Sequence, residues 1–312
     1  MSDLDHLSDD QIQDRASLWR RATDWRARWT RRISLSRMPT LPDHYAAVLT
    51  LPAELLGLGW LAVALTAPDT HLHPLVRCAP VAHGRAPVAS LAYVDAHQAS
   101  SHGPNAALDA PSTIKLGAAF NIDNHPTFTL LSLIALLWRV IGYPYEPSDG
   151  PSRRLAEAID RCGATSPTAD NPAKQLALAL HERIPVFWGD DLAAPIAVDW
   201  AMRQQWYAER AAFGFATPDL VRGPLLARFP RYWPNTAHFV HLQLAPPDTL
   251  ATQTTHILTQ RRFPTTALTA PASDLDAALY WLEFGEWLGL YSACLNNVDP
   301  ADRVPHTILF SP

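Results

Sequence analysis

The sequence predicts an α/β protein built from two doubly wound lobes, each a parallel sheet flanked by helices. Short β-prone runs alternate along the chain with longer apolar stretches of helical pattern, which is the order that parallel strands and their crossover helices produce. The length of 312 residues suits two domains. Hydrophobic residues make up 48% of the chain and charged residues 18%, a balance typical of a globular protein that buries a core.

In the first half, residues 8–33 predict a helix with a tryptophan-containing apolar stripe and arginines on its other faces. The stripe either lies on the body of the protein, with the arginines in water, or the helix contacts a membrane or phosphate groups. Strands are expected over residues 45–49, 88–94 and 113–116, and buried helices over 53–65 and 128–141.

A cluster of proline and glycine predicts the boundary between the lobes. Such residues punctuate regular structure and mark connections. We therefore expect a first lobe with its N-terminal helix over residues 1–143, a linker over 144–172 and a second lobe over 173–312. The cluster consists of Pro144, Pro147, Gly150, Pro151, Gly163, Pro167 and Pro172.

The second half has the clearer pattern, in which helices and strands alternate without interruption. This order predicts a doubly wound unit. The expected helices cover residues 171–183, 192–212, 248–261 and 274–296, and the expected strands cover 184–188, 238–244 and 265–268.

Composition argues against several classes of protein. A net charge of -5 argues against nucleic-acid binding by the whole chain, although the arginine-rich first helix keeps that alternative open. Three widely spaced cysteines predict no disulfide framework and a reducing cytoplasm. Apolar stretches are shorter than the ~20 residues that span a bilayer. The closest histidine pairs, His71/His73 and His238/His241, lack the spacing of a metal site, so we expect neither a metal nor another cofactor.

Three stretches of the second half resemble the C-terminal half of the bifunctional phosphoglucose/phosphomannose isomerases, which have the sugar isomerase (SIS) fold. They begin at Asn171-Pro-Ala-Lys, at Ala197-Val-Asp-Trp and at Trp281-Leu-Glu-Phe-Gly, and the second runs through Gln205-Trp-Tyr-Ala-Glu-Arg. The third stretch leads to Asn297-Val-Asp-Pro, which is similar to the family's closing Gly-Val-Asp-Pro. The resemblance covers residues 171–312 and implies two SIS lobes, a sugar phosphate ligand and aldose–ketose isomerisation.

The resemblance also implies site residues. Glu209 falls on the family's catalytic glutamate, which moves a proton between two sugar carbons; otherwise it is an exposed helix residue. Arg222 stands where the family has the ring-opening histidine, and an arginine cannot exchange that proton but can hold a phosphate. The loop after the 88–94 strand contains Ser100, Ser101 and Asn105, which either bind the phosphate or form a polar surface loop.

Several of the family's reactive positions are thus replaced while its overall pattern remains. We expect a sugar-phosphate-binding protein with weak or no isomerase activity, or one that binds a partner or is only structural. The alternative is an active glucose-6-phosphate/mannose-6-phosphate isomerase that uses Glu209 as its base. The tryptophan content and the family's sites near subunit contacts lead us to expect a homodimer, with no nucleic-acid or membrane partner.

Overall fold

The structure is a computed structural model in which the chain divides into two compact units. One unit is Ser17–Gly150, and the other combines Met1–Ala16 with Pro151–Pro312 and is called here the C-terminal unit. The predicted helix over residues 8–33 lies outside the described residues. These are residue 4, then residues 45–51, 56–66, 76–80, 90–95, 113–115, 130, 133–134, 137, 160–225, 233–244, 247–270 and 274–298.

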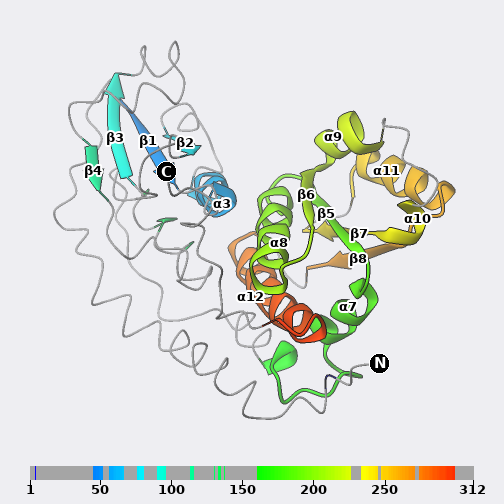
Figure 1. The fold of residues 1–312 in the computed structure, drawn as a ribbon. Coiled ribbons are helices and arrows are strands. Elements are labelled where there is room, and N and C mark those ends of the chain that lie inside the picture. Colours follow the sequence, from blue (N-terminus) through cyan, green and yellow to red (C-terminus); the bar gives the residue numbers. More distant parts are fainter. Residues whose placement is uncertain are drawn as a thin grey trace, which may run out of the picture. The chain divides into compact units, whose positions relative to one another are not determined.

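The C-terminal unit is built on a four-stranded sheet (Figure 1), which is parallel, as predicted, although only three of its strands were expected. Its strands are β5 (Ile184–Gly189), β6 (Phe213–Ala216), β7 (Ala237–Gln243) and β8 (Thr265–Thr269). Their order across the sheet is β6-β5-β7-β8, and every neighbouring pair runs parallel. After β5, the chain adds β6 on one side of that strand. It then crosses to the other side of β5, where it adds β7 and, beyond it, β8.

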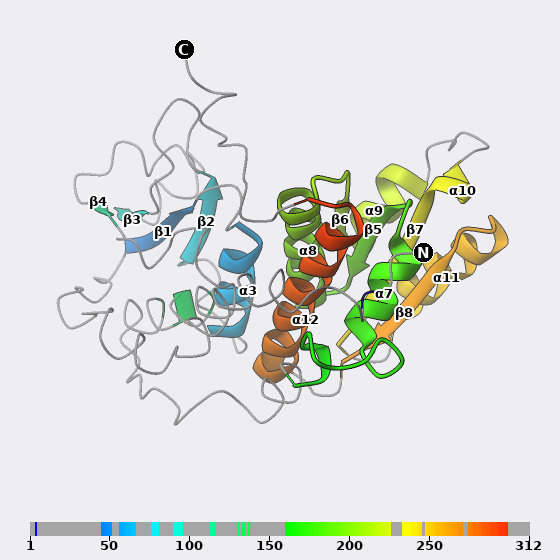
Figure 2. The same cartoon turned by 60° about the horizontal axis from the view of Figure 1, so that its bottom comes forward.

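Helices α7 (Pro172–Leu180), α8 (Ala193–Ala208) and α12 (Asp274–Leu295) lie together on one face of this sheet (Figure 2). The side chain of Asn171 caps α7 by accepting hydrogen bonds from the amides of Ala173 and Lys174, and Pro172 suits the first helical position. Successive strand residues point to opposite faces, so Phe187 of β5 meets the ring of Trp200 on α8 edge to face.

The opposite face carries α9 (Thr217–Leu220) and α11 (Thr249–Gln260), which cover a second apolar core. Asp248 caps α11 through its carboxylate and the amide of Ala251. The segment between β6 and β7 also includes a π-helical turn, Val221–Leu225, and α10 (Trp233–Thr236). The core contains Val186, Trp188, Leu220, Ala237, Phe239, Ala251, Leu258 and Phe263.

One predicted helix, over residues 192–212, is too long, and the prediction missed the strand that follows it. Helix α8 ends at Ala208 because Glu209 adopts the left-handed conformation, with φ of 48°, and the chain then forms β6. Strand β6 is short and contains Gly214, where a Cβ atom would lie 2.5 Å from the Cα of Val198. This glycine lets the strand lie directly against α8, but it also weakens the β pattern in the sequence.

Each of the four long helices of this unit is followed within two residues by a residue that is not glycine but has left-handed backbone. These residues are Glu182 after α7, Glu209 after α8, Arg262 after α11 and Asn297 after α12, with φ values between 48° and 63°. A left-handed residue commonly ends a helix, although glycine is the usual choice because it has no Cβ atom.

A buried cluster of charged side chains joins α8 to α12. The guanidinium of Arg203, which is 1% exposed, lies 3.2 Å from a carboxylate oxygen of Asp199 and 2.8 Å from one of Glu286. The hydroxyl of Tyr207 donates to the second oxygen of Glu286 at 2.8 Å. Buried carboxylates are costly unless they are paired, so this cluster fixes how the two helices meet.

The other unit contains strands β1 (Tyr45–Leu51), β2 (Val76–Pro80), β3 (Ser90–Asp95) and β4 (Thr113–Lys115), and helix α3 (Leu56–Thr66). Their sheet is mixed. Strand β1 runs parallel to β2, but it is antiparallel to β3, which is antiparallel to β4. The parallel sheet predicted for this half is therefore wrong for β3 and β4. A period-2 pattern does not reveal strand direction, and β2 was not predicted at all.

We expect Arg203→Met to lower the free energy of unfolding by about 3–5 kcal/mol, because the substitution leaves two buried carboxylates without their cation. Urea denaturation followed by circular dichroism measures the change. Arg222→Met is the matched control, since Arg222 is exposed. An Arg203→Met protein as stable as the wild type would show that the cluster does not hold α8 on α12.

Candidate functional site

The carboxyl edge of the parallel sheet contains a topological switch point between β5 and β7. Helix α8 leaves β5 toward one face, and α11 follows β7 on the other face. The two connections diverge here, and open α/β sheets bind ligands in the crevice that forms beyond such strand ends. The residues that follow β5 and β7 are therefore the first place to look for a site.

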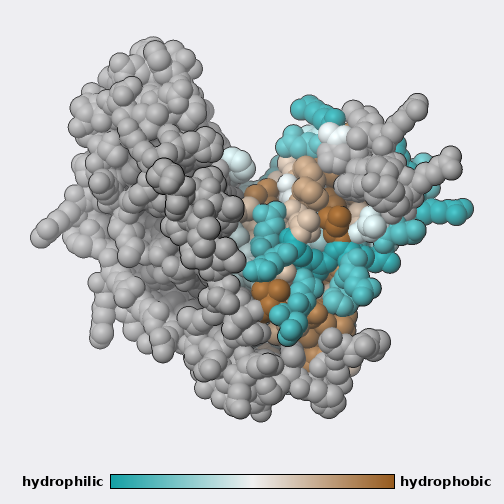
Figure 3. Space-filling model, in the orientation of Figure 1, coloured by the Kyte–Doolittle hydropathy of each residue, from teal (hydrophilic) through white to brown (hydrophobic). Residues whose placement is uncertain are grey.

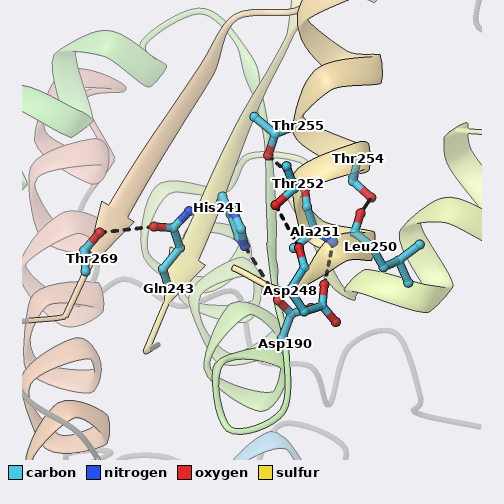
Figure 4. Close-up of polar contacts among 10 residues, drawn as sticks. All are labelled: Asp190, His241, Gln243, Asp248, Leu250, Ala251, Thr252, Thr254, Thr255 and Thr269. Atoms are coloured by element: carbon cyan, nitrogen blue, oxygen red, sulfur yellow. Dashed lines mark hydrogen bonds and ion pairs between the residues drawn. The ribbon is translucent and has the colours of Figure 1, made fainter. Parts of the chain in front are cut away.

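Polar side chains from separate connections meet at this edge (Figure 4). Asp190 follows β5 directly, His241 and Gln243 lie near the end of β7, and Asp248 begins α11. Gly189 permits the tight turn from β5 into α8, because a Cβ atom there would lie 2.6 Å from the Cβ of Ala193. Thr217, which follows β6, is fully buried.

His241 is held in place by Trp188 on the adjoining strand β5 and by Gln243 on its own strand. Its ring stacks on that of Trp188, with centroids 3.6 Å apart and an interplanar angle of 7°. The carboxamide nitrogen of Gln243 lies 3.0 Å from Nδ1 of His241, while the carboxamide oxygen accepts a hydrogen bond from the hydroxyl of Thr269 at 3.1 Å. With this amide orientation, Nδ1 is an acceptor and Nε2 carries the proton.

That Nε2 atom points toward Asp190, from whose carboxylate oxygen it lies 4.0 Å away. Burial lowers the pKa of His241 to about 4, with Asp248 acting in the opposite direction, so the ring is neutral at pH 7. Burial also raises the pKa of Asp190, with Thr217 opposing this rise and Asp248 and Asp191 adding to it.

The pair therefore presents a neutral N–H donor beside a carboxylate acceptor. Raised carboxylate pKa values are common among acid–base and ligand-binding groups, because they are produced by the burial that a site requires. Within the described part of the chain, no three histidine, cysteine or acidic residues are grouped so that they could hold a metal ion. A neutral N–H donor beside a carboxylate acceptor is suited to hydrogen bonding and proton transfer.

The site residues predicted from the sequence lie elsewhere. Glu209 is exposed at the end of α8, and this 16-residue helix separates it from Asp190 by about 24 Å. Arg222 is exposed in the π-helical turn beyond β6. Among the described residues, no hydrogen bond or ion pair joins Glu209 to Arg222. Ser100, Ser101 and Asn105 lie outside the described residues.

The sequence prediction did not identify Asp190 and assigned no role to His241. Two signals could have revealed them. Asp190 directly follows the glycine that ends a buried strand, a position that in a parallel sheet faces the ligand edge. His241 is a polar residue within an otherwise apolar strand, and its meaning depends on the register that pairs it with Trp188.

A family model described as the bacterial phospho-glucose isomerase C-terminal SIS domain matches residues 169–305. No curated protein sequence matches the chain. Within the part of the chain that the structure describes, no helix has both the length and the apolar character needed to cross a membrane.

Solved structures are similar to the chain over nearly all of its length. A glucose-6-phosphate isomerase like protein from Thermus thermophilus is 18% identical with a TM-score of 0.55, covering 96% of this chain and 98% of its own. Tagatose-6-phosphate ketose/aldose isomerase from Escherichia coli is 12% identical with a TM-score of 0.51, covering 97% and 96%. At these identities the likeness concerns the fold.

We expect the protein to lose stability as the pH falls from about 6.5 to about 4, in part because His241 must gain a proton that its buried site disfavours. The unfolded chain binds this proton at higher pH than the folded chain, so acid favours unfolding. The shift from 6.5 to about 4 corresponds to roughly 3 kcal/mol.

Urea denaturation at pH 7.5 and pH 5 measures this effect, and His241→Phe should reduce the difference between the two values while keeping the stacked ring. His256→Gln is the control, because His256 is exposed on α11. An unchanged difference in His241→Phe would contradict the assignment.

Proposed function

We propose that the protein binds a sugar phosphate and isomerises it weakly or not at all, a proposal supported by the match of residues 169–305 to the family model of the bacterial phospho-glucose isomerase C-terminal SIS domain. The observation that supports the binding proposal is the group of polar side chains at the switch point of the parallel sheet, where Asp190 and His241 face each other. Fold alone does not determine activity, so the residues that would perform the reaction decide between binding and catalysis.

Two sets of residues are proposed, each on its own grounds, to contact the phosphate: Arg222, and separately the loop residues Ser100, Ser101 and Asn105. A guanidinium forms charge-assisted hydrogen bonds with phosphate oxygens, and serine hydroxyls with backbone amides commonly complete such a site. Arg222 is exposed and available for this contact. The three loop residues are proposed on their order in the sequence after a predicted strand.

Weak turnover follows from the groups that the reaction needs. Arginine replaces the expected ring-opening histidine at position 222, and a guanidinium stays protonated at usable pH. Glu209 is exposed and lies about a helix length from Asp190 and His241, the polar pair at the switch point. The alternative function is an active glucose-6-phosphate/mannose-6-phosphate isomerase in which Glu209 moves the proton.

Calorimetric titration with fructose 6-phosphate tests the binding proposal. We expect saturable binding that weakens about tenfold in Arg222→Gln, because one charge-assisted contact to the phosphate is lost. Arg262→Gln, which alters another exposed arginine, should bind like the wild type. Absence of any binding by the wild-type protein would refute the proposed function.

A coupled assay that converts fructose 6-phosphate to glucose 6-phosphate or mannose 6-phosphate tests catalysis. We expect slow or undetectable turnover, because the loss of an acid–base group typically costs about 10²-fold or more. Rapid turnover that disappears in Glu209→Gln would establish the alternative. Glu182→Gln is the matched control, since Glu182 is also an exposed glutamate with left-handed backbone at the end of a helix.

We also infer that the protein forms a homodimer. Phe213, on the edge strand β6, is 43% exposed, and exposed aromatic side chains are favoured at subunit contacts. On the face drawn in Figure 3, the apolar areas of the described residues are broken up by hydrophilic ones, a mixture that suits a modest interface. Light scattering at tens of micromolar should give twice the monomer mass, and a monomer would refute the inference.

Two further expectations remain proposals. One is that the first half of the chain is a diverged lobe of the same SIS kind, with boundaries at residues 143 and 173. This is supported by fold likeness to solved structures over nearly the whole chain, although its described strands form a mixed sheet. The other is the cytoplasmic location predicted from the cysteines.

A further inference from the structure

We propose that His241 and Asp190 together bind one hydroxyl group of the sugar, forming a subsite for the carbohydrate part of the ligand and not for its phosphate. This inference rests on the proposed sugar-phosphate function and gives a binding role to a site that the sequence resemblance leaves without one. It follows from what the two side chains can donate and accept.

The donor is the Nε2–H group of His241. Nδ1 is occupied by the carboxamide of Gln243, so only Nε2 remains, and among the described residues it has no hydrogen-bond partner. The side chain is 1% exposed. A buried donor without a partner costs stability, and such groups in folded proteins call for an explanation, of which a missing ligand is one.

The acceptor is the carboxylate of Asp190, whose Oδ2 lies 4.0 Å from Nε2. This distance is too long for a direct hydrogen bond, but one oxygen atom placed between the two atoms, about 2.8 Å from each, would bridge them. That atom must accept from the imidazole and donate to the carboxylate. A hydroxyl group does both.

Other parts of a sugar phosphate, or of an amino sugar, do not match this pair. An ionised phosphate oxygen cannot donate to Asp190, and it would also be repelled by Asp191 and Asp248, which act electrostatically on the same carboxylate. An ammonium group cannot accept from Nε2–H. The donor–acceptor pattern thus selects a hydroxyl group among the groups that such ligands carry.

The exposure of the two side chains determines the side from which the sugar hydroxyl can approach. Nε2 of His241 is closed off from solvent, whereas the side chain of Asp190 is 30% exposed. The hydroxyl therefore reaches Nε2 from the side of Asp190, whose carboxylate moves aside to admit it. Stacking on Trp188 keeps the imidazole in place, so the carboxylate is the adjustable partner.

The test compares fructose 6-phosphate with its monodeoxy analogues by calorimetric titration. We expect one analogue to bind the wild-type protein about tenfold more weakly than the parent sugar, because it lacks the bridging hydroxyl. In Asp190→Ala the parent should weaken by a similar factor, and the discrimination against that analogue should vanish. Asp219→Ala, an exposed residue of α9, is the matched control.

Asp190→Leu, which keeps the branched shape of the side chain but has no acceptor, serves if Asp190→Ala does not fold. Equal binding of fructose 6-phosphate by wild type and variant would overturn the subsite and leave the proposed function standing. Failure of fructose 6-phosphate to bind, combined with Asp190-dependent binding of unphosphorylated fructose by NMR titration, would support the subsite and refute the proposed function. Binding of neither sugar would mean that the pair holds only an ordered water, and would overturn both.

Discussion

The guanidinium of Arg203 lies between the carboxylates of Asp199 and Glu286, and the position of α8 depends on this buried contact. A charge in the interior tolerates little displacement, because its partners must stay within hydrogen-bond reach. The indole N–H of Trp200 adds a second fixed point by donating to the carbonyl of Trp281 on α12 at 2.8 Å. Gly285 lets that ring approach, since a Cβ atom there would lie 2.4 Å from the indole nitrogen.

The core also fixes the backbone segments that carry the candidate site. Helix α8 begins three residues after Asp190, and the turn between them is closed by a hydrogen bond from the amide of Ala193 to the carbonyl of Asp190. On the other side, His241 belongs to a central strand and is stacked on Trp188. The backbones that carry the carboxylate and the imidazole are therefore held separately by the core, while the partly exposed Asp190 side chain can still adjust.

The sequence predicted the features that short-range patterns determine and missed those that depend on how distant segments pair. The parallel sheet of the C-terminal unit, the helix that follows Asp248 and the long final helix all follow from short-range patterns, and the sequence predicted the strands β5, β7 and β8. Strand β6 was missed because its four residues include a glycine whose purpose is contact with α8. The His241–Asp190 pair depends on the register between two strands and on the order of strands in the sheet, which no local pattern contains.

The residues with left-handed backbone at the helix ends affect the thermal stability of the C-terminal unit. A side chain in this conformation costs roughly 1–2 kcal/mol that glycine would not. Glu182, Glu209 and Arg262 carry that cost at the ends of their helices, whereas Asn297 carries less of it, because asparagine adopts this conformation more readily. Glycine replacements at the first three positions would therefore raise thermal stability without altering the core or the Asp190–His241 pair.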